Sequence, residues 1–253
     1  MLREERKRKI SEFIEEKKRA TVAELSKLFG VSESTIRRDL EELDGKGEIQ
    51  RAHGGAVSVE RSAPEPPVVH RMVESEEEKR RIGQVAARLV QDGEVIFLGS
   101  GATTLEVARN LDGKNDLTVI TNALNVANQL ADNQDITVII IGGLLRHSEL
   151  SLVGHITEQA LRELRADKVI MGMRSVSVQE GLTNDYLPET MTDRAIVNFA
   201  PEIIIVADHS KFGKVSTALV APISSVHKII TDSGISPQQL DALRQAGVEV
   251  IVV

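Results

Sequence analysis

The sequence predicts an α/β protein in two parts: a small N-terminal winged helix-turn-helix domain and a larger Rossmann-like α/β domain. Before residue 60, two short amphipathic helices are joined by a Gly-containing turn. The proline-rich residues 62–67 then interrupt the chain, because proline fixes φ and extends the residue before it. Beyond them, non-alternating apolar runs alternate with helical patterns, as in a parallel sheet between helix layers. We therefore expect domains at residues 1–60 and 75–253 with a linker at 61–74.

The composition favours an aliphatic core. The 253 residues are 41% hydrophobic but include only five Phe, one Tyr and no Trp. No apolar run approaches the roughly 20 residues that span a bilayer, and the charged start of the chain is unlike a secretory signal. With no Cys and no His pair spaced four apart, we expect no disulfide, metal or cofactor site, and a cytoplasmic location.

The charge is unevenly distributed along the chain. Residues 1–60 carry 13 Lys/Arg and 13 Asp/Glu, for a net charge of 0, whereas residues 61–253 carry 18 and 25, for a net charge of −7. Any nucleic-acid binding must therefore come from a local basic patch rather than from the field of the whole chain.

Residues 32–44 have the pattern of a DNA-reading helix. Ser32 is a good N-cap, and Ile36, Leu40 and Leu43 share one face. Hydroxyl residues at the N-terminal end and two adjacent arginines on the opposite face suit a DNA major groove. An ordinary amphipathic helix with a solvated charged face is the alternative.

The flanking residues complete a winged helix. Residues 2–18 have a helical pattern, and Thr21 and Glu24 form a capping box that opens a helix ended by Gly30, with Leu28 among its expected buried residues. After the DNA-reading helix, two β-prone runs flank Gly54-Gly55, which predicts a hairpin. Such a wing would bring two side chains toward phosphates or a minor groove, Arg51 and His53; an exposed loop histidine is the alternative for His53.

The N-terminal residues resemble the DeoR family of bacterial transcriptional regulators. The similarity lies in the strings Thr-Ile-Arg-Arg-Asp-Leu (residues 35–40) and Arg-Ala-His-Gly-Gly-Ala (residues 51–56) at the expected spacing. It implies a winged helix that docks on operator DNA, usually as a repressor. Asp39 is expected to orient an arginine, because phosphate would repel its carboxylate. The expected DNA-binding residues are Ser32, Ser34, Thr35, Arg37, Arg38, Arg51 and His53.

The larger domain has a regular alternation of elements. The run at residues 138–141 does not alternate, which predicts a strand buried on both faces. Strands are predicted at residues 95–98, 117–120, 136–141, 168–171, 203–206, 228–231 and 248–252, and helices at 75–91, 104–111, 124–131, 155–163, 192–198 and 237–245.

Polar residues follow four of these strands, where an open α/β sheet binds its ligands. A Gly-rich loop at residues 99–104 offers free amides and hydroxyls for a phosphate, although a tight strand-to-helix turn explains it as well. Asn122 suits a sugar hydroxyl, and Arg146 suits a phosphate or a surface pair with Glu149. Lys211 follows a fourth strand beside Asp208. Together they indicate a pocket for a small anionic, polyhydroxylated molecule.

Residues 75–253 also resemble the effector-sensing domain of the DeoR family, which is similar to ribose-5-phosphate isomerase. The resemblance implies a phosphorylated sugar as effector. Two features depart from the family: Gly99 stands where many members have Asp, and residues 184–193, which hold the single Tyr, are a variant segment. The expected effector-binding residues are Gly99, Ser100, Gly101, Ala102, Thr103, Thr104, Asn122, Arg146, Asp185 and Lys211.

Three functions follow from these patterns. The first is a DNA-binding repressor of carbohydrate genes, a homo-oligomeric dimer or tetramer on two-fold operator DNA, released by a phosphorylated sugar. The second is a sugar-phosphate isomerase or deaminase, although no compact pair of acids stands out among its candidate bases. The third is an interaction protein with an incidental winged helix. The candidate bases of the second are Asp185, Glu189, Asp208 and His209.

Overall fold

The computed structural model describes residues 3–17, 19–45, 48–52, 54–58, 60–61 and 66–253. The chain forms two compact units, residues 1–61 and 62–253, and each is described by itself. The N-terminal unit ends with a short strand, β4 (Glu60–Arg61), and the larger unit opens with a short helix, α4 (Val68–Arg71).

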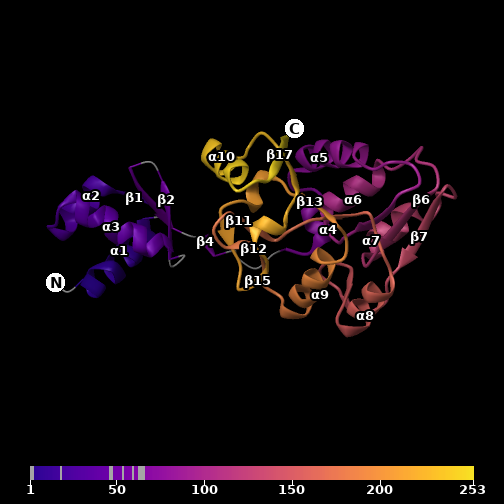
Figure 1. The fold of residues 1–253 in the computed structure, drawn as a ribbon, viewed down its shortest axis with the longest axis horizontal. Helices are drawn as coiled ribbons and strands as arrows, with labels where there is room; N and C mark the ends of the chain where they lie inside the picture. Colours follow the sequence, from indigo (N-terminus) through magenta and orange to yellow (C-terminus); the bar gives the residue numbers. More distant parts are fainter. Residues whose placement is uncertain (1–2, 18, 46–47, 53, 59, 62–65) are drawn as a thin grey trace. The chain divides into compact units, whose positions relative to one another are not determined.

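The N-terminal unit is a three-helix domain with a three-stranded antiparallel sheet in the order β1-β3-β2 (Figure 1). The β2–β3 hairpin is the predicted wing, whereas β1 is a strand that sequence patterns did not predict. Its elements are α1 (Arg3–Lys17), β1 (Arg19–Thr21), α2 (Val22–Phe29), α3 (Glu33–Gly45), β2 (Ile49–Ala52) and β3 (Gly55–Ser58).

Local signals set the helix boundaries of this unit. The Thr21 hydroxyl accepts from the Glu24 N–H and the Glu24 carboxylate accepts in return, so the predicted capping box is confirmed. Gly30 ends α2 with φ of 66°. The expected burial of Leu28 is wrong, since it is 53% exposed on the outer side of α2. The aliphatic core contains Ile10, Ile14, Ala20, Val22, Leu25, Ile36, Leu40, Leu43, Ile49 and Ala56.

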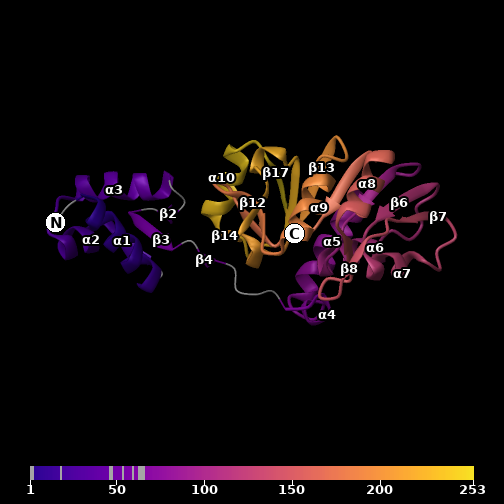
Figure 2. The same cartoon turned by 90° about the horizontal axis from the view of Figure 1, so that it is seen from below.

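The larger unit is built on a seven-stranded parallel sheet in the order β17-β16-β13-β10-β5-β6-β7 (Figures 1 and 2). All seven predicted strands are found in it. Their bounds are β5 (Val95–Leu98), β6 (Leu117–Thr121), β7 (Ile136–Ile140), β10 (Lys168–Met171), β13 (Glu202–Val206), β16 (Lys228–Thr231) and β17 (Glu249–Val252).

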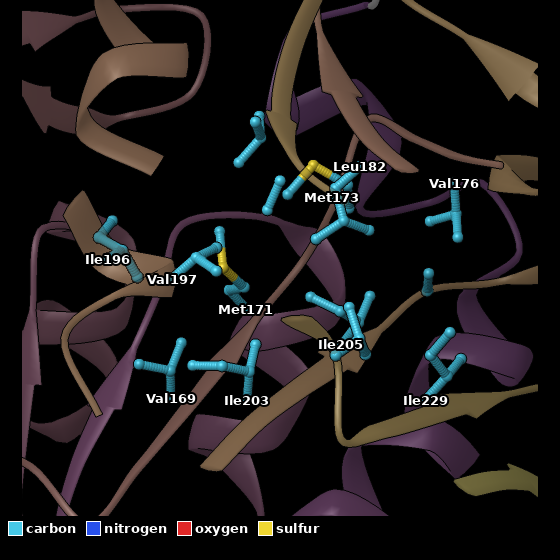
Figure 3. Close-up of a cluster of buried hydrophobic side chains, with 14 of the residues drawn as sticks. Val169, Met171, Met173, Val176, Leu182, Ile196, Val197, Ile203, Ile205 and Ile229 are labelled. Carbon is cyan, nitrogen blue, oxygen red and sulfur yellow. The ribbon is translucent and has the colours of Figure 1, made fainter. Parts of the chain in front are cut away.

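Helices cover both faces of this sheet. The pleat sends Ile170 into the core beneath α5, α6 and α7, while Val169 and Met171 enter the core beneath α8, α9 and α10 (Figure 3). Side chains of the inner strands, such as β10, are therefore buried on both faces. The helices are α5 (Glu76–Arg88), α6 (Ala102–Arg109), α7 (Leu124–Leu130), α8 (His155–Glu163), α9 (Leu187–Val197) and α10 (Pro237–Gln245).

Several elements differ from the prediction. α9 begins five residues earlier than expected, at Leu187, with Pro188 in its first turn, where a missing N–H costs nothing. β7 is an edge strand, so Ile140 is 53% exposed and the expected burial of both its faces is wrong. Elements outside the prediction are β8 (Leu144–Arg146), β9 (Ser151–Val153), β11 (Ser175–Ser177), β12 (Gly181–Asn184), β14 (Lys214–Val215), β15 (Ala218–Ala221), η1 (His209–Lys211) and η2 (Ile223–Ser225).

Candidate DNA-binding surface and ligand pocket

The outer face of α3 carries the predicted arginines into solvent. Ser34, Arg37 and Arg38 are exposed, opposite the buried Ile36 and Leu40. Arg37 Nη2 donates to Glu33 Oε2 over 2.7 Å in an exposed pair one turn apart, which water screens strongly. Both guanidinium groups can therefore reorient toward a phosphate or a base edge without breaking the core.

Hydroxyl groups gather at the N-terminal end of α3. Ser32 Oγ lies 2.9 Å from Ser34 Oγ and 2.8 Å from Thr35 Oγ1, and it accepts from the Thr35 N–H over 3.3 Å. Ser32 is therefore the N-cap of α3, as predicted. Free backbone amides and hydroxyl donors at a helix N-terminus suit contact with DNA phosphate.

Asp39 lies on the inner side of α3. It is 1% exposed and accepts from Arg6 of α1, with 2.6 Å between Arg6 Nε and Asp39 Oδ2 and 3.2 Å between Arg6 Nη2 and Oδ1. These hydrogen bonds raise the pKa of Arg6. Asp39 therefore orients an arginine, as expected, but that arginine fastens α1 to α3 rather than facing DNA.

One of the two predicted wing residues is described. Arg51 is exposed on β2, and its N–H donates to Asp44 Oδ1 over 2.9 Å, which ties the hairpin to the end of α3. His53 lies outside the described residues.

The larger unit has a pocket at the carboxyl ends of β13, β10, β5 and β6, four neighbouring strands of the sheet. This is the edge at which open α/β sheets bind ligands. The lining residues are Arg71, Glu74, Ser75, Lys79, Gly99, Ser100, Gly101, Ala102, Thr103, Asn122, Glu149, Met171, Gly172, Met173, Arg174, Asn184, Glu189, Asp193, Ile196, Val206, Ala207, Asp208, Ser210 and Lys211.

Seven of the ten predicted effector residues line this pocket and three do not. Thr104 is buried, and its hydroxyl donates to the Gly101 carbonyl over 3.0 Å. Asp185 Oδ2 accepts from Nε of the pocket residue Arg174 over 3.2 Å. These two side chains therefore form hydrogen bonds to residues of the pocket wall without lining the cavity themselves. The seven in the wall are Gly99, Ser100, Gly101, Ala102, Thr103, Asn122 and Lys211.

Arg146 is the third residue outside the wall. It pairs with Glu189, and its guanidinium lies 4.7 Å from the centre of the Tyr186 ring. The expected alternative of a surface pair with Glu149 is wrong, because Glu149 is buried and pairs with Arg71. Arg146 therefore pairs with a pocket acid, Glu189, which the sequence indicates only as a candidate base of the isomerase alternative.

The phosphate-sized end of the pocket is formed by the loop after β5. Gly101 caps α6 with φ of 135°, a conformation that favours glycine, and α6 then presents its first free amides. A Cβ at Gly99 would lie 3.1 Å from Met171 Cβ, so the packing behind this position leaves little room for the Asp that the family resemblance leads us to expect.

Cations from two other elements line the same pocket. Lys79 of α5 lies 3.5 Å from Asp208, and Lys211 follows in η1. Burial opposes ionisation of Asp208, but the Ser210 hydroxyl and the charges of Lys79 and Lys211 outweigh it and lower the pKa of Asp208. Asp208 is therefore ionised, and it fixes the cations around it.

The pocket wall also contains two neighbouring acids, Glu189 and Asp193, one turn apart on α9. Asn184 Nδ2 donates to Glu189 Oε2 over 3.0 Å and to Asp193 Oδ2 over 2.9 Å. Burial and the charge of Glu189 raise the pKa of Asp193 well above its ordinary value. Sequence reasoning missed this pair, although its spacing of four residues on a helix was a usable signal.

Asn122 has a fixed orientation in the wall. Its Nδ2 donates to the Leu152 carbonyl over 3.0 Å, while its buried Oδ1 has no hydrogen-bond donor among the described residues. A buried carbonyl without a donor is costly, so this oxygen suits a donor group of a bound ligand.

Part of the expected linker belongs to the pocket. Arg71 of α4 pairs with Glu149, its Nε donates to the Pro66 carbonyl over 3.0 Å, and the Val68 N–H donates to the Ser148 carbonyl over 2.7 Å. Both Arg71 and Glu74 line the pocket. Residues 66–74 therefore pack against the larger unit, a role that the prolines concealed.

A winged helix-turn-helix unit followed by a pocket at the ligand edge of an α/β sheet defines a ligand-responsive transcriptional regulator. The comparisons with known families agree with this class. Residues 6–62 match the DeoR-like helix-turn-helix domain, and residues 74–233 match the DeoR C-terminal sensor domain. The chain belongs to the DeoR family of DNA-binding transcriptional regulators.

Relatives match over nearly the whole chain. It is 34% identical to a putative aga operon transcriptional repressor of Escherichia coli O157:H7, over 98% of this chain and 93% of the relative. It is 35% identical to the transcriptional repressor AccR of Agrobacterium fabrum, over 91% and 90%. It is 34% identical to the transcriptional regulator GlpR of Haloferax volcanii, over 99% and 98%. These relatives are named as regulators rather than enzymes, which disfavours the isomerase alternative.

Solved structures are more distant. Ribose-5-phosphate isomerase A of Methanocaldococcus jannaschii aligns with a TM-score of 0.42 and 19% identity over 55% of each chain. Translation initiation factor eIF-2B of Pyrococcus horikoshii aligns with a TM-score of 0.43 and 19% identity over 64% of each chain. Neither similarity assigns an activity to this chain.

No helix among the described residues is both long and apolar enough to span a membrane. No group of three or more His, Cys, Asp or Glu side chains within the described part of the chain is arranged to hold a metal ion.

Proposed function

We propose that this protein is a repressor of carbohydrate genes that binds operator DNA through α3 and the wing, and that a phosphorylated sugar in the pocket releases it. The observation that carries the effector half is that the α6 N-terminus, Lys79 and Lys211 line the same pocket. Oriented amides and cations together recognise a phosphate group.

The exposed face of α3 supports the DNA-binding half. Arg37 and Arg38 would read base edges or phosphates in a major groove, with Ser34 and Thr35 beside the backbone and Arg51 at the wing. One helix covers few base pairs, so two copies on a two-fold operator are proposed, as a dimer or a tetramer. Its relatives are bacterial and archaeal, so operator and effector would meet in the cytoplasm.

Residues 66–74 would couple ligand binding in the pocket to the position of the DNA-binding unit. They are the part of the larger unit next to the DNA-binding unit in the chain, and Arg71 reaches the pocket wall. An effector that contacts Arg71 or its partner Glu149 would favour one position of this segment over another. A population shift of this kind releases DNA only if the effector prefers the conformation that misplaces α3.

The test is a thermal-shift screen of the full chain against phosphorylated sugars, followed by operator binding with each ligand that stabilises it. The full chain is used because a fragment starting at residue 75 would lack Arg71 and Glu74. The operator is selected by the wild-type chain from random duplexes. We expect at least one sugar phosphate to raise Tm and weaken operator binding; stabilisation without any change in operator affinity would contradict the proposal.

A further inference from the structure

Asp193 is a buried pocket carboxyl group without a cationic partner among the described residues. It is 8% exposed, and only the neutral Asn184 amide donates to it, over 2.9 Å. The acids around it are paired differently: Glu189 with Arg146, and Glu149 with Arg71.

Asn122 provides an independent sign of a missing ligand group in the same pocket. It is 2% exposed, its amide nitrogen is engaged by the Leu152 carbonyl, and its Oδ1 is buried without a donor. This side chain therefore offers the pocket a buried acceptor without a partner among the described residues. A ligand group that reaches this oxygen must donate a hydrogen bond.

The proposed phosphate loop and Asn122 follow adjacent strands. Gly101 lies in the loop after β5, and Asn122 follows β6, the next strand in the order β13-β10-β5-β6. Adjacent strands are about 4.8 Å apart, so a molecule as small as one sugar phosphate can reach both strand ends. A ligand can therefore present an anionic group to the loop and a donor group to Asn122 in the same pocket, which Asp193 also lines.

We propose that the effector carries a positively charged amino group in addition to its phosphate, and that Asp193 and Asn122 bind that amino group. The inference rests on the proposed function, because it concerns the same pocket. An ammonium group has three donors and no acceptor, which suits a carboxylate and a carbonyl together. A hydroxyl group could satisfy the Asn122 oxygen, but it carries no charge with which to pair the Asp193 carboxylate in its ionised form.

The surroundings of Asp193 predict a proton change on binding. Burial raises the pKa of Asp193, the charges of Glu189 and Glu149 add to the rise, and the Asn184 amide and the Arg146 charge oppose it. An ammonium at the carboxyl group favours its ionised form and lowers that pKa again. Amine binding should therefore favour release of a proton that burial retains on Asp193.

The experiment is isothermal titration calorimetry of the full chain with glucosamine 6-phosphate and glucose 6-phosphate, which differ by the amino group. At about pH 6.5 a sugar amine is protonated. We expect the amino sugar to bind at least about tenfold tighter, as a hydrogen bond to a charged group allows. Titrations in two buffers of different ionisation enthalpy should show that its binding releases a proton, a measurement that needs no variant.

Asp193→Asn keeps the shape of the side chain and removes its ability to ionise, so the variant should fold. We expect it to lose the preference for the amino sugar and the proton release, while glucose 6-phosphate binding stays within about twofold of wild type. Equal affinity of the wild-type chain for the two sugars, or amine binding without proton release, would overturn the inference and leave the proposed function intact. If no phosphorylated sugar binds at all, the proposed function fails as well.

Discussion

The α3 surface and the pocket use charge in opposite ways. On α3, Arg37 and Arg38 stand in water, and the Arg37–Glu33 pair is exposed on both sides. In the pocket, Asp208 and Asp193 are both buried, and their neighbours lower the pKa of the first and raise that of the second. Exposed charges can be exchanged with little cost in stability, whereas buried charges are fixed by specific partners. The first arrangement suits a polyanion reached by diffusion, and the second suits one small molecule.

Removing a buried charge should have the largest effect. Asp39→Ala leaves Arg6 without its carboxylate partner inside the N-terminal unit, where Arg6 is only 12% exposed. We expect a loss of about 3 kcal/mol in the free energy of unfolding of this unit. Denaturant unfolding measures it. Glu41→Ala, on the exposed side of the same helix, is the control, with a change within about 0.5 kcal/mol; equal losses for both would erase the distinction between the two faces.

Removing an exposed charge should affect DNA binding alone. Arg37→Ala should weaken operator binding at least about tenfold, or about 1.4 kcal/mol, with Tm unchanged, because one arginine contact contributes about that much. Fluorescence anisotropy measures the affinity. Arg8→Ala is the matched control, since Arg8 forms an exposed pair one turn apart with Glu12 on α1. An equal loss of affinity in both variants would indicate a non-specific charge effect rather than docking through α3.

The phosphate end of the pocket can be tested through its backbone. Gly101→Ala places a Cβ at φ of 135°, which costs about 1–3 kcal/mol unless the loop moves. We expect a lower Tm and a smaller thermal shift from the phosphorylated sugar. Gly142→Ala is the control, because a Cβ there meets nothing within 4 Å and φ is outside the positive range. If the ligand raises the Tm of Gly101→Ala as much as it raises that of wild type, this loop does not contribute to effector binding.

The smallest effect should be a pH dependence of the empty pocket. Because the folded-state pKa of Asp193 is raised, the unfolded chain loses this proton at lower pH than the folded chain does. Stability should therefore fall as pH rises above the ordinary aspartate value of about 4, toward the raised pKa. Tm measured against pH should show this decline in wild type and a weaker one in Asp193→Asn. Identical pH profiles would mean that Asp193 titrates normally.

Sequence patterns predicted the elements that local chemistry specifies. The capping box at Thr21, the glycine end of α2 and the seven apolar strands need only neighbouring residues, and the structure has all of them. The strand-end loops with Gly101, Asn122 and Lys211 also lie in the pocket wall, because parallel strands carry their carboxyl ends to one edge.

The remaining pocket residues come from contacts between distant segments. Arg71 lies in a stretch whose prolines suggest a linker, and its partner Glu149 is 78 residues away. Asp193 has the spacing of a helix face, but its unusual environment arises only when Asn184 and Glu189 fold around it. Whether a charge is exposed or buried depends on tertiary packing, which local sequence patterns do not specify. The apolar run at residues 138–141 is another example, because Ile140 is exposed at the edge of the sheet.

The separation of DNA binding from ligand binding is tested most directly by measuring both activities on two variants of the full chain, Arg37→Ala and Lys211→Gln. We predict that Arg37→Ala loses operator affinity but keeps the full thermal shift from a phosphorylated sugar. Lys211→Gln should bind operator as wild type does while its response to the sugar is lost. If either variant loses both activities while its Tm in the absence of ligand is unchanged, the two surfaces do not act as separate reader and sensor.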